Sequence, residues 1–88
     1  LDQNPRNLSV QLLLADSLLA AGDWRRSIAV LEGLRTRLGN HDAAVLSGLA
    51  WAYDGAGRHE RALNFGRAAH ALAPTDPRVN AIYGRVLL

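Results

Sequence analysis

The chain has 88 residues, of which 49% are hydrophobic and 20% are charged. This composition is typical of a folded protein and excludes a disordered one, and the length allows one small domain with a modest core. The formal net charge is only +2, and the ten basic residues are all arginines spread along the chain. A nucleic-acid surface would gather basic side chains and interleave aromatic ones, so we expect no nucleic-acid binding.

The chain contains no cysteine, which excludes disulfide bonds and thiolate metal sites. No apolar run approaches the length of a membrane span, and no basic segment precedes a hydrophobic one at the start. Because the chain begins without methionine and ends inside a helical pattern, we expect it to be a piece of a longer protein. Basic residues that are all arginine, with abundant alanine and leucine, suggest a bacterial source.

Two helices are predicted in the first half of the chain. The first begins at Asn4-Pro5, since asparagine caps a helix and proline suits its first position, or at Asn7, a second possible cap, and it ends at Gly22. The second lies between the cap Asp23 and the turn Gly39-Asn40. The expected buried face comprises Leu8, Leu12, Leu14, Ala15, Leu18, Leu19 and Ala21 in the first helix, and Trp24, Ile28, Leu31, Leu34 and Leu38 in the second.

Three further helical patterns follow. Asp42 caps the third, which ends at Gly55-Ala56-Gly57, and the fourth runs from Arg58 to Ala73, where Pro74 stops it. Asp76-Pro77 opens the fifth. The expected buried residues are Val45, Leu46, Leu49, Ala50 and Tyr53, then Ala62, Leu63, Phe65, Ala69 and Leu72, then Val79, Ile82, Tyr83, Val86 and Leu87. No segment alternates like a strand, so the sequence predicts an all-α protein whose neighbouring helices are antiparallel.

The helical patterns recur at a spacing of about 34 residues. The matched pairs are Gly22 with Gly57, Leu14 with Leu49, Ala15 with Ala50, Asp42 with Asp76, and Ala50 with Gly84. The pattern resembles the tetratricopeptide repeat family, whose signature positions in the middle repeat are occupied by Leu46, Leu49, Ala50, Tyr53, Gly57, Ala62, Ala69 and Pro74. Gly66 departs from that signature, because a large apolar residue is usual there.

The resemblance implies antiparallel helix-turn-helix repeats stacked as a right-handed α-solenoid. A single domain would span residues 1–88, with repeat 1 at about 8–42, repeat 2 at about 43–76 and a partial repeat 3 at about 77–88. Small residues (Ala15, Ala50, Gly84 and Ala62) are expected where the two helices of a unit approach closely. The first repeat matches less well, so we expect its second helix to pack farther from the first.

The resemblance also implies a concave groove, lined by the first helix of each unit, that binds a protein or peptide. Carried over by position, the groove residues are Ser9, Leu12, Asp16, Leu19, Ala44, Ser47, Trp51, Asp54, Arg78, Ala81 and Arg85. Trp51 is either an anchor for the partner or a groove wall packed on Leu12, Leu19 or Arg85. Arg78 and Arg85 either receive an acidic group of the partner or pair with Asp54 and solvent.

The residues that could carry chemistry do not form a catalytic or metal-binding pattern. His41, His59 and His70 lack the convergent ligands of a metal site, and no serine has a histidine at a helical-neighbour spacing. The turn at Gly55-Ala56-Gly57 follows a helix and lacks the ending of a phosphate-binding loop. We therefore expect no catalytic residue, no cofactor, no metal and no enzymatic activity.

Three functions follow from these patterns. The first is a protein- or peptide-binding scaffold module, a fragment of a larger bacterial assembly or secretion protein. The second is an RNA-binding helical repeat, although the groove positions supply no evident base-reading code. The third is a structural spacer that associates with itself through its open C-terminal end, where Tyr83, Val86 and Leu87 would lack a covering helix.

Overall fold

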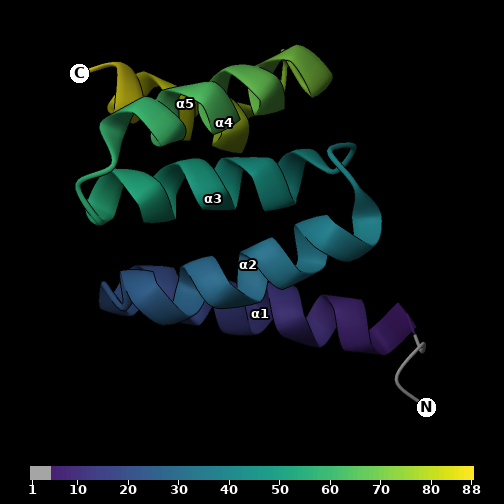
Figure 1. Ribbon diagram of the computed structural model, residues 1–88. Coiled ribbons are helices and arrows are strands. Elements are labelled where there is room, and N and C mark those ends of the chain that lie inside the picture. Colours follow the sequence, from purple (N-terminus) through teal and green to yellow (C-terminus); the bar gives the residue numbers. More distant parts are fainter. Residues whose placement is uncertain (1–4) are drawn as a thin grey trace.

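The computed structural model describes residues 5–88, so the predicted cap at Asn4 lies outside the described residues. The described part of the chain forms helices and turns and contains no strand, which confirms the all-helical class. The helices are α1 (Pro5–Ala21), α2 (Trp24–Leu38), α3 (Ala43–Gly55), α4 (His59–Leu72) and α5 (Pro77–Leu87) (Figure 1). Consecutive helices run in opposite directions, so α1, α3 and α5 share one direction.

Aspartate side chains begin three of these helices, as the sequence predicts. The carboxylate of Asp42 accepts from the backbone amides of Ala44, at 2.9 Å, and Val45, at 3.2 Å. Asp23 and Asp76 cap α2 and α5 in the same way. Each such cap contributes about 1 kcal/mol by satisfying amides that have no partner within the helix.

Glycines with positive φ angles end the helices that precede the short turns. Gly22 has a φ of 77° after α1 and Gly57 has a φ of 83° after α3, in the left-handed region that other residues rarely adopt. These two matched residues reverse the chain within each helical hairpin. The turn chemistry read from the sequence is therefore confirmed.

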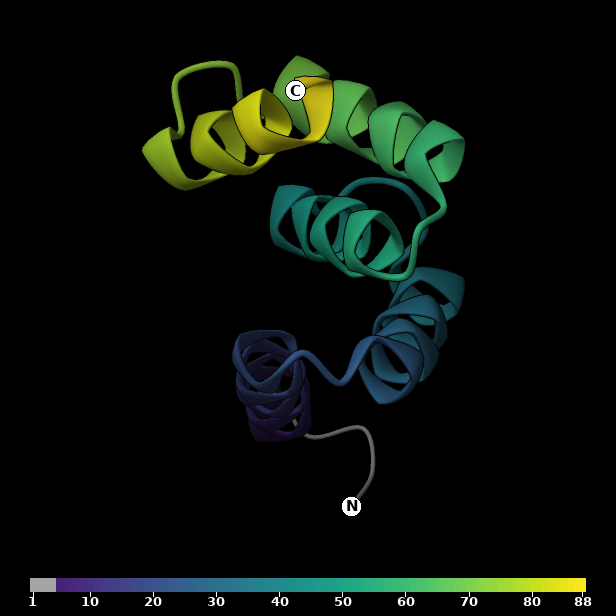
Figure 2. The same ribbon diagram turned by 90° about the vertical axis from the view of Figure 1, so that its left-hand side faces the viewer.

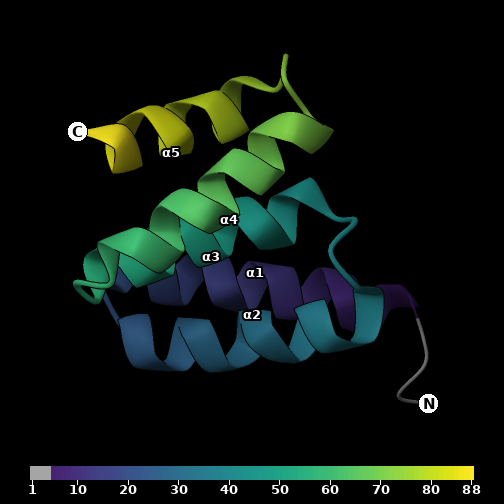
Figure 3. The same cartoon turned by 45° about the horizontal axis from the view of Figure 1, so that its top comes forward.

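The helices form two sides. In Figure 2, α1, α3 and α5 lie toward one side and α2 and α4 toward the other, and α3 is set back between α1 and α5. The α1 and α2 helices lie at one end of the molecule and α5 at the other (Figure 3). The central helix, α3, packs against all four others, and its contact with α4 is the most extensive in the molecule.

Because of this central place, α3 is buried on nearly every side. Its buried residues are Val45, Leu46, Ser47, Gly48, Leu49, Ala50, Ala52 and Tyr53. The single stripe predicted from the sequence was too narrow, since it left out Ser47, Gly48 and Ala52. A helix covered from several directions needs small or apolar residues all round, not along one face.

The predicted buried face of α1 was wrong in part. Only Ala15 and Leu19 are buried, whereas Leu14, which was predicted to face inward, exposes 48% of its surface. Val10 and Leu13, which were not part of the predicted face, expose 59% and 66%. The reason is that α1 packs only on α2 and α3, which leaves its other side uncovered. Other residues predicted to face inward but found exposed are Ala21, Leu38, Leu72 and Leu87.

The small residues lie at helix contacts where helices are present to make them. Ala15, Ala50 and Ala62 are at most 1% exposed, as predicted. Gly84 is exposed, and a Cβ atom there would meet nothing within 4 Å, because no helix of the described residues packs on that side of α5. The close contact predicted at Gly84 therefore does not form within this chain.

Two other glycines make room for aromatic rings. A Cβ atom on Gly66 would lie 2.8 Å from Cδ1 of Tyr83 on α5, which explains why this position departs from the repeat signature. A Cβ atom on Gly55 would overlap the Trp24 indole ring on α2. Each glycine thus serves a contact with the neighbouring helix that the sequence pattern did not reveal.

We expect opposite effects from two glycine-to-alanine substitutions inside helices. Gly33→Ala, at a position with nothing within 4 Å of the new methyl group, should raise the free energy of unfolding by about 0.5 to 1 kcal/mol through helix propensity. Gly66→Ala gains the same propensity but must displace Tyr83, so it should lower the free energy of unfolding by roughly 1 kcal/mol or more. Urea unfolding of both variants measures the difference, and stabilisation by Gly66→Ala would contradict this packing.

Candidate partner-binding surface

The predicted groove residues lie on the three helices that share one direction. Leu12, Asp16 and Leu19 belong to α1, Ser47, Trp51 and Asp54 belong to α3, and Arg78 and Arg85 belong to α5. The α3 helix packs against both α1 and α5. We call the surface that these three helices form the α1–α3–α5 face.

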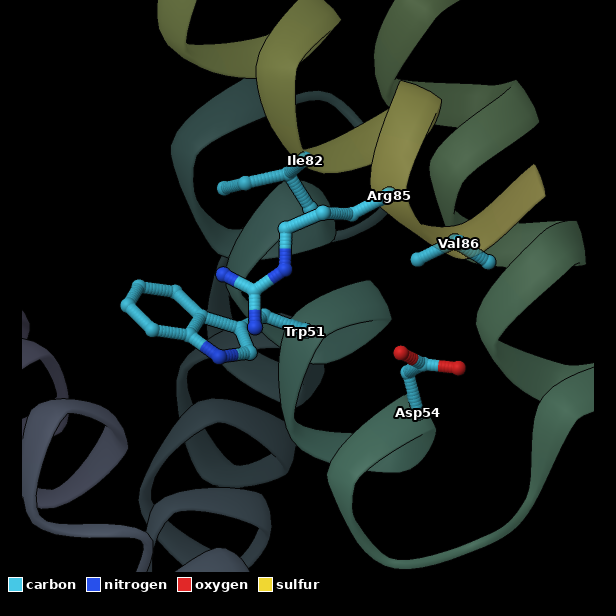
Figure 4. Close-up of a pocket in the computed structure, with 5 residues that line it drawn as sticks. All are labelled: Trp51, Asp54, Ile82, Arg85 and Val86. Atoms are coloured by element: carbon cyan, nitrogen blue, oxygen red, sulfur yellow. The ribbon is translucent and has the colours of Figure 1, made fainter. Parts of the chain in front are cut away.

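A small recess on this face lies between α3 and α5. It is lined by Trp51, Asp54, Ile82, Arg85 and Val86 (Figure 4). The guanidinium carbon of Arg85 lies 5.3 Å from the centroid of the Trp51 ring, a cation–π contact. These side chains fill the recess so fully that it has no room for a water molecule.

The half-buried Trp51 makes one of the contacts expected of a groove wall, the contact with Arg85. Its indole Nε1 atom is buried and has no hydrogen-bond partner among the described residues. An unpaired buried donor costs about 1 to 3 kcal/mol, so an acceptor that reached it would gain binding energy. Trp51 therefore packs against Arg85 in the free protein, while its indole N–H group stays available to an acceptor of a partner.

An ion pair joins the first helix of the chain to the last. Arg78 Nη2 donates to Asp16 Oδ1 at 2.6 Å, between residues 62 positions apart in the sequence. The backbones of α1 and α5 do not approach one another elsewhere, so this pair spans the face in front of α3. The alternative in which Arg78 pairs with Asp54 is wrong, because the Asp54 carboxylate lies 3.3 Å from Nδ1 of His59.

Burial divides the predicted groove residues into two groups. Leu19 and Ser47 are only 2% and 3% exposed, and the Ser47 hydroxyl donates to the Ala44 carbonyl at 3.2 Å, so neither is accessible to a partner. Leu12 is half-buried and packs against the core. The small side chains of Ser9, Ala44 and Ala81 are exposed, and the larger side chains left for a partner are Asp16, Trp51, Asp54, Arg78 and Arg85.

A second polar cluster, missed by the sequence reading, joins α2 to α3 on the other side of the molecule. The Tyr53 hydroxyl donates to Glu32 Oε2 at 2.6 Å, and Arg35 Nε donates to Glu32 Oε1 at 2.8 Å. The Tyr53 ring stacks on Phe65 with centroids 5.5 Å apart, and the Arg61 guanidinium lies over its ring. No local signal in the sequence links Glu32 to Tyr53, because the two residues are 21 positions apart.

Within this cluster the pKa of Glu32 is lowered and the pKa of Tyr53 is raised. Burial in itself raises the pKa of Glu32, but the hydrogen bonds from Tyr53 and Arg35, with the charges of Arg35 and Arg61, outweigh it and hold the pKa below its ordinary value. Burial and the hydrogen bond to Glu32 raise the pKa of Tyr53. An ionised Glu32 and a neutral Tyr53 therefore fix the contact between the two helices at neutral pH.

Metal sites and membrane spans are the other kinds of feature that the described residues could form. Residues 5–88 contain no group of three or more histidine, aspartate or glutamate side chains that could hold a metal ion. None of the five helices in this range combines the length and the hydropathy that crossing a bilayer requires.

Comparisons with known proteins give no family assignment. No protein-family model, no curated protein and no solved structure matches the chain. What this chain does is therefore inferred from the residues of the α1–α3–α5 face and their geometry.

We expect the Tyr53–Glu32 hydrogen bond to stabilise the fold in a pH-dependent way. Tyr53→Phe should lower the free energy of unfolding by roughly 1.5 kcal/mol at neutral pH, because it removes a hydrogen bond to a charged group. The folded pKa of Glu32 is lowered, so the stability contributed by its charge is present above the ordinary value of 4.5 and is lost as the pH falls through the folded value. The effect of the substitution should therefore shrink at about pH 3.

Urea unfolding at both pH values tests this, with Tyr83→Phe as the matched control. The Tyr83 hydroxyl makes no hydrogen bond within the described part of the chain, so its loss should have little effect at either pH. An equal loss of stability for Tyr53→Phe at both pH values would show that the ionised carboxylate does not matter.

Proposed function

We propose that this chain is a protein-binding scaffold module that binds an extended segment of a partner protein on the α1–α3–α5 face. The observation that carries the proposal is the grouping of Trp51, Arg78 and Arg85 on one face built from three helices of the same direction. Tryptophan and arginine are the residues most enriched at energetically dominant positions of protein interfaces. The acidic residues Asp16 and Asp54 on the same face provide polar contacts around them.

We further propose that the helices are tetratricopeptide-like repeats stacked as a right-handed α-solenoid. The recurrence of positive-φ glycines at 22 and 57 and of capping aspartates at 42 and 76 supports this, since matched residues perform matched tasks. The arrangement of α1, α3 and α5 on one side of the molecule and α2 and α4 on the other (Figure 2) is the one expected of stacked helical hairpins.

Binding suits this face better than catalysis. Its larger accessible side chains are two arginines, two carboxylates and an indole, and the described residues of the face bring no serine and histidine together as a nucleophile and its base. An indole ring and guanidinium groups supply area and directional donors, which are the requirements of peptide recognition.

We expect Trp51→Ala to weaken partner binding at least tenfold while the helices remain formed. The substitution removes the largest side chain of the face, and a tenfold loss corresponds to about 1.4 kcal/mol. Peptides selected from a random displayed library would be titrated against both proteins, with circular dichroism to monitor folding. The matched control is Arg67→Ala, an exposed position on α4 on the other side of the molecule.

Unchanged affinity in a folded Trp51→Ala protein would dismiss Trp51 as the anchor. Equal losses for Trp51→Ala and Arg67→Ala would place the partner elsewhere. Failure of every peptide to bind would refute the proposed function.

Self-association is a second candidate, and the exposed apolar surface favours it. Val10, Leu13 and Leu14 are exposed, whereas the residues 35 positions later, Val45, Gly48 and Leu49, are buried where α1 and α2 cover them. Beside them, an open groove of about 300 Å³ between α1 and α2 is lined by Gln11, Leu14, Ala29, Val30, Gly33 and Arg37. An apolar surface of this kind marks an interaction site.

This places the exposed surface mainly at the N-terminal end of the described chain, not at the C-terminal end named from the sequence. Val86 is only 1% exposed and Tyr83 is half-buried, because α5 packs on α3 and α4. Leu87, at 56%, is the exposed member of that set.

If copies associate through the N-terminal surface, the mass measured by light scattering should rise with concentration, and Leu13→Glu should reduce the rise. A charge there would be buried without a partner in the complex. Ala71→Glu, at an exposed position of α4, is the control and should leave the rise unchanged. A monomer at all concentrations, in the unchanged protein, would rule out self-association.

A further inference from the structure

Two arginines mark out a spacing on the α1–α3–α5 face. Arg78 and Arg85 lie seven residues apart on α5, so their backbones are separated by about 10.5 Å along the helix axis. In an extended peptide of the polyproline II conformation, three residues cover about 9 Å and complete one turn, so side chains three residues apart point to the same side. Two carboxylates three residues apart in such a peptide would therefore reach both guanidinium groups.

The first of these arginines, Arg78, already has a carboxylate partner, Asp16. Its Oδ1 atom accepts from a single nitrogen of Arg78, and the two side chains are 41% and 58% exposed. The remaining donors of the guanidinium group make no ion pair within residues 5–88. An exposed pair held through one nitrogen is easily exchanged, whereas a peptide carboxylate could approach Arg78 with both oxygens.

The second arginine, Arg85, lies over an aromatic ring. Arg85 makes no ion pair within the described residues and lies over Trp51, whose indole Nε1 is buried without an acceptor. A peptide carboxylate that binds Arg85 lies close to the Trp51 ring, and one of its oxygens can accept from the indole N–H group once the ring edge is exposed. Asp54 lines the same recess (Figure 4).

We propose that the α1–α3–α5 face binds an extended acidic peptide whose two carboxylates, three residues apart, engage Arg78 and Arg85, and that Asp16 is an internal competitor for the first of them. This inference rests on the proposed function and specifies the chemistry of its partner. In the free protein Asp16 occupies Arg78, and the bound peptide replaces the Asp16 carboxylate with one of its own.

The same two arginines could in principle receive phosphates of single-stranded RNA. The arrangement favours the acidic peptide, because RNA places a phosphate at every nucleotide and would bring several of them beside Asp16 and Asp54. A peptide can place its two charges at the arginines and neutral groups elsewhere.

The experiment is a fluorescence anisotropy titration with three labelled peptides of otherwise equal sequence. One carries two glutamates three residues apart, the second carries glutamines in their place, and the third carries the glutamates side by side. We expect the first to bind at least tenfold more tightly than the second and several-fold more tightly than the third. Its affinity should fall as the ionic strength rises.

Protein variants identify the groups that take part. Arg78→Gln and Arg85→Gln should each weaken binding of the acidic peptide about tenfold, while the exposed control Arg67→Gln should not. Asp16→Asn should tighten binding of the acidic peptide several-fold and leave the glutamine peptide unchanged. The second half of this result separates competition from a general loosening of the fold.

A nuclear magnetic resonance measurement follows the indole directly. The N–H signal of Trp51 should move downfield when the acidic peptide is added to the unchanged protein, because the group gains an acceptor. The same addition to Arg85→Gln should move it less.

The outcomes that overturn the inference are separate from those that overturn the proposed function. Equal binding of the acidic and glutamine peptides, or no gain from Asp16→Asn, would refute the acidic partner while a peptide-binding face remained. Binding of no peptide of any charge would refute the proposed function itself. Arg78-dependent binding of oligouridylate without binding of the acidic peptide would replace the peptide by RNA.

Discussion

The close approach of α3 and α4 is the contact on which the rest of the structure depends. Ala50 and Ala62 are fully buried, and Gly66 is buried beside them with its missing side chain replaced by the Tyr83 ring of α5. Larger residues at these positions would separate the two helices and remove the support of α5. Because α3 also packs on α1 and α2, this one contact determines where both ends of the molecule lie.

Polar groups then fix how the hairpins are oriented. Glu32 and Tyr53 join the first hairpin to the second on one side, through a short hydrogen bond in a half-buried setting. Asp16 and Arg78 join the first helix to the last on the opposite side, through an exposed ion pair. The first link contributes to stability, whereas the second is exposed and easily exchanged, as the proposed binding of a partner on this face requires.

Burial agrees with only part of the candidate surface read from the sequence. Of the eleven groove residues, eight are accessible and three are buried or packed against the core. Leu19 and Ser47 are buried because α3 is covered from more directions than one stripe of residues can show. The unpaired indole nitrogen of Trp51 could not be read from the sequence, since its burial depends on how the helices around it pack.

The sequence by itself determined the helices and where they begin and end. The signals for these are local: Asp42 caps within three residues of itself, and Gly57 turns the chain at its own φ angle. The tertiary structure decided which apolar residues are covered, so that Leu14 is exposed while its counterpart Leu49 is buried. It also decided the pairing of Asp16 with Arg78, because that contact needs the summed geometry of five helices and four turns in the described chain.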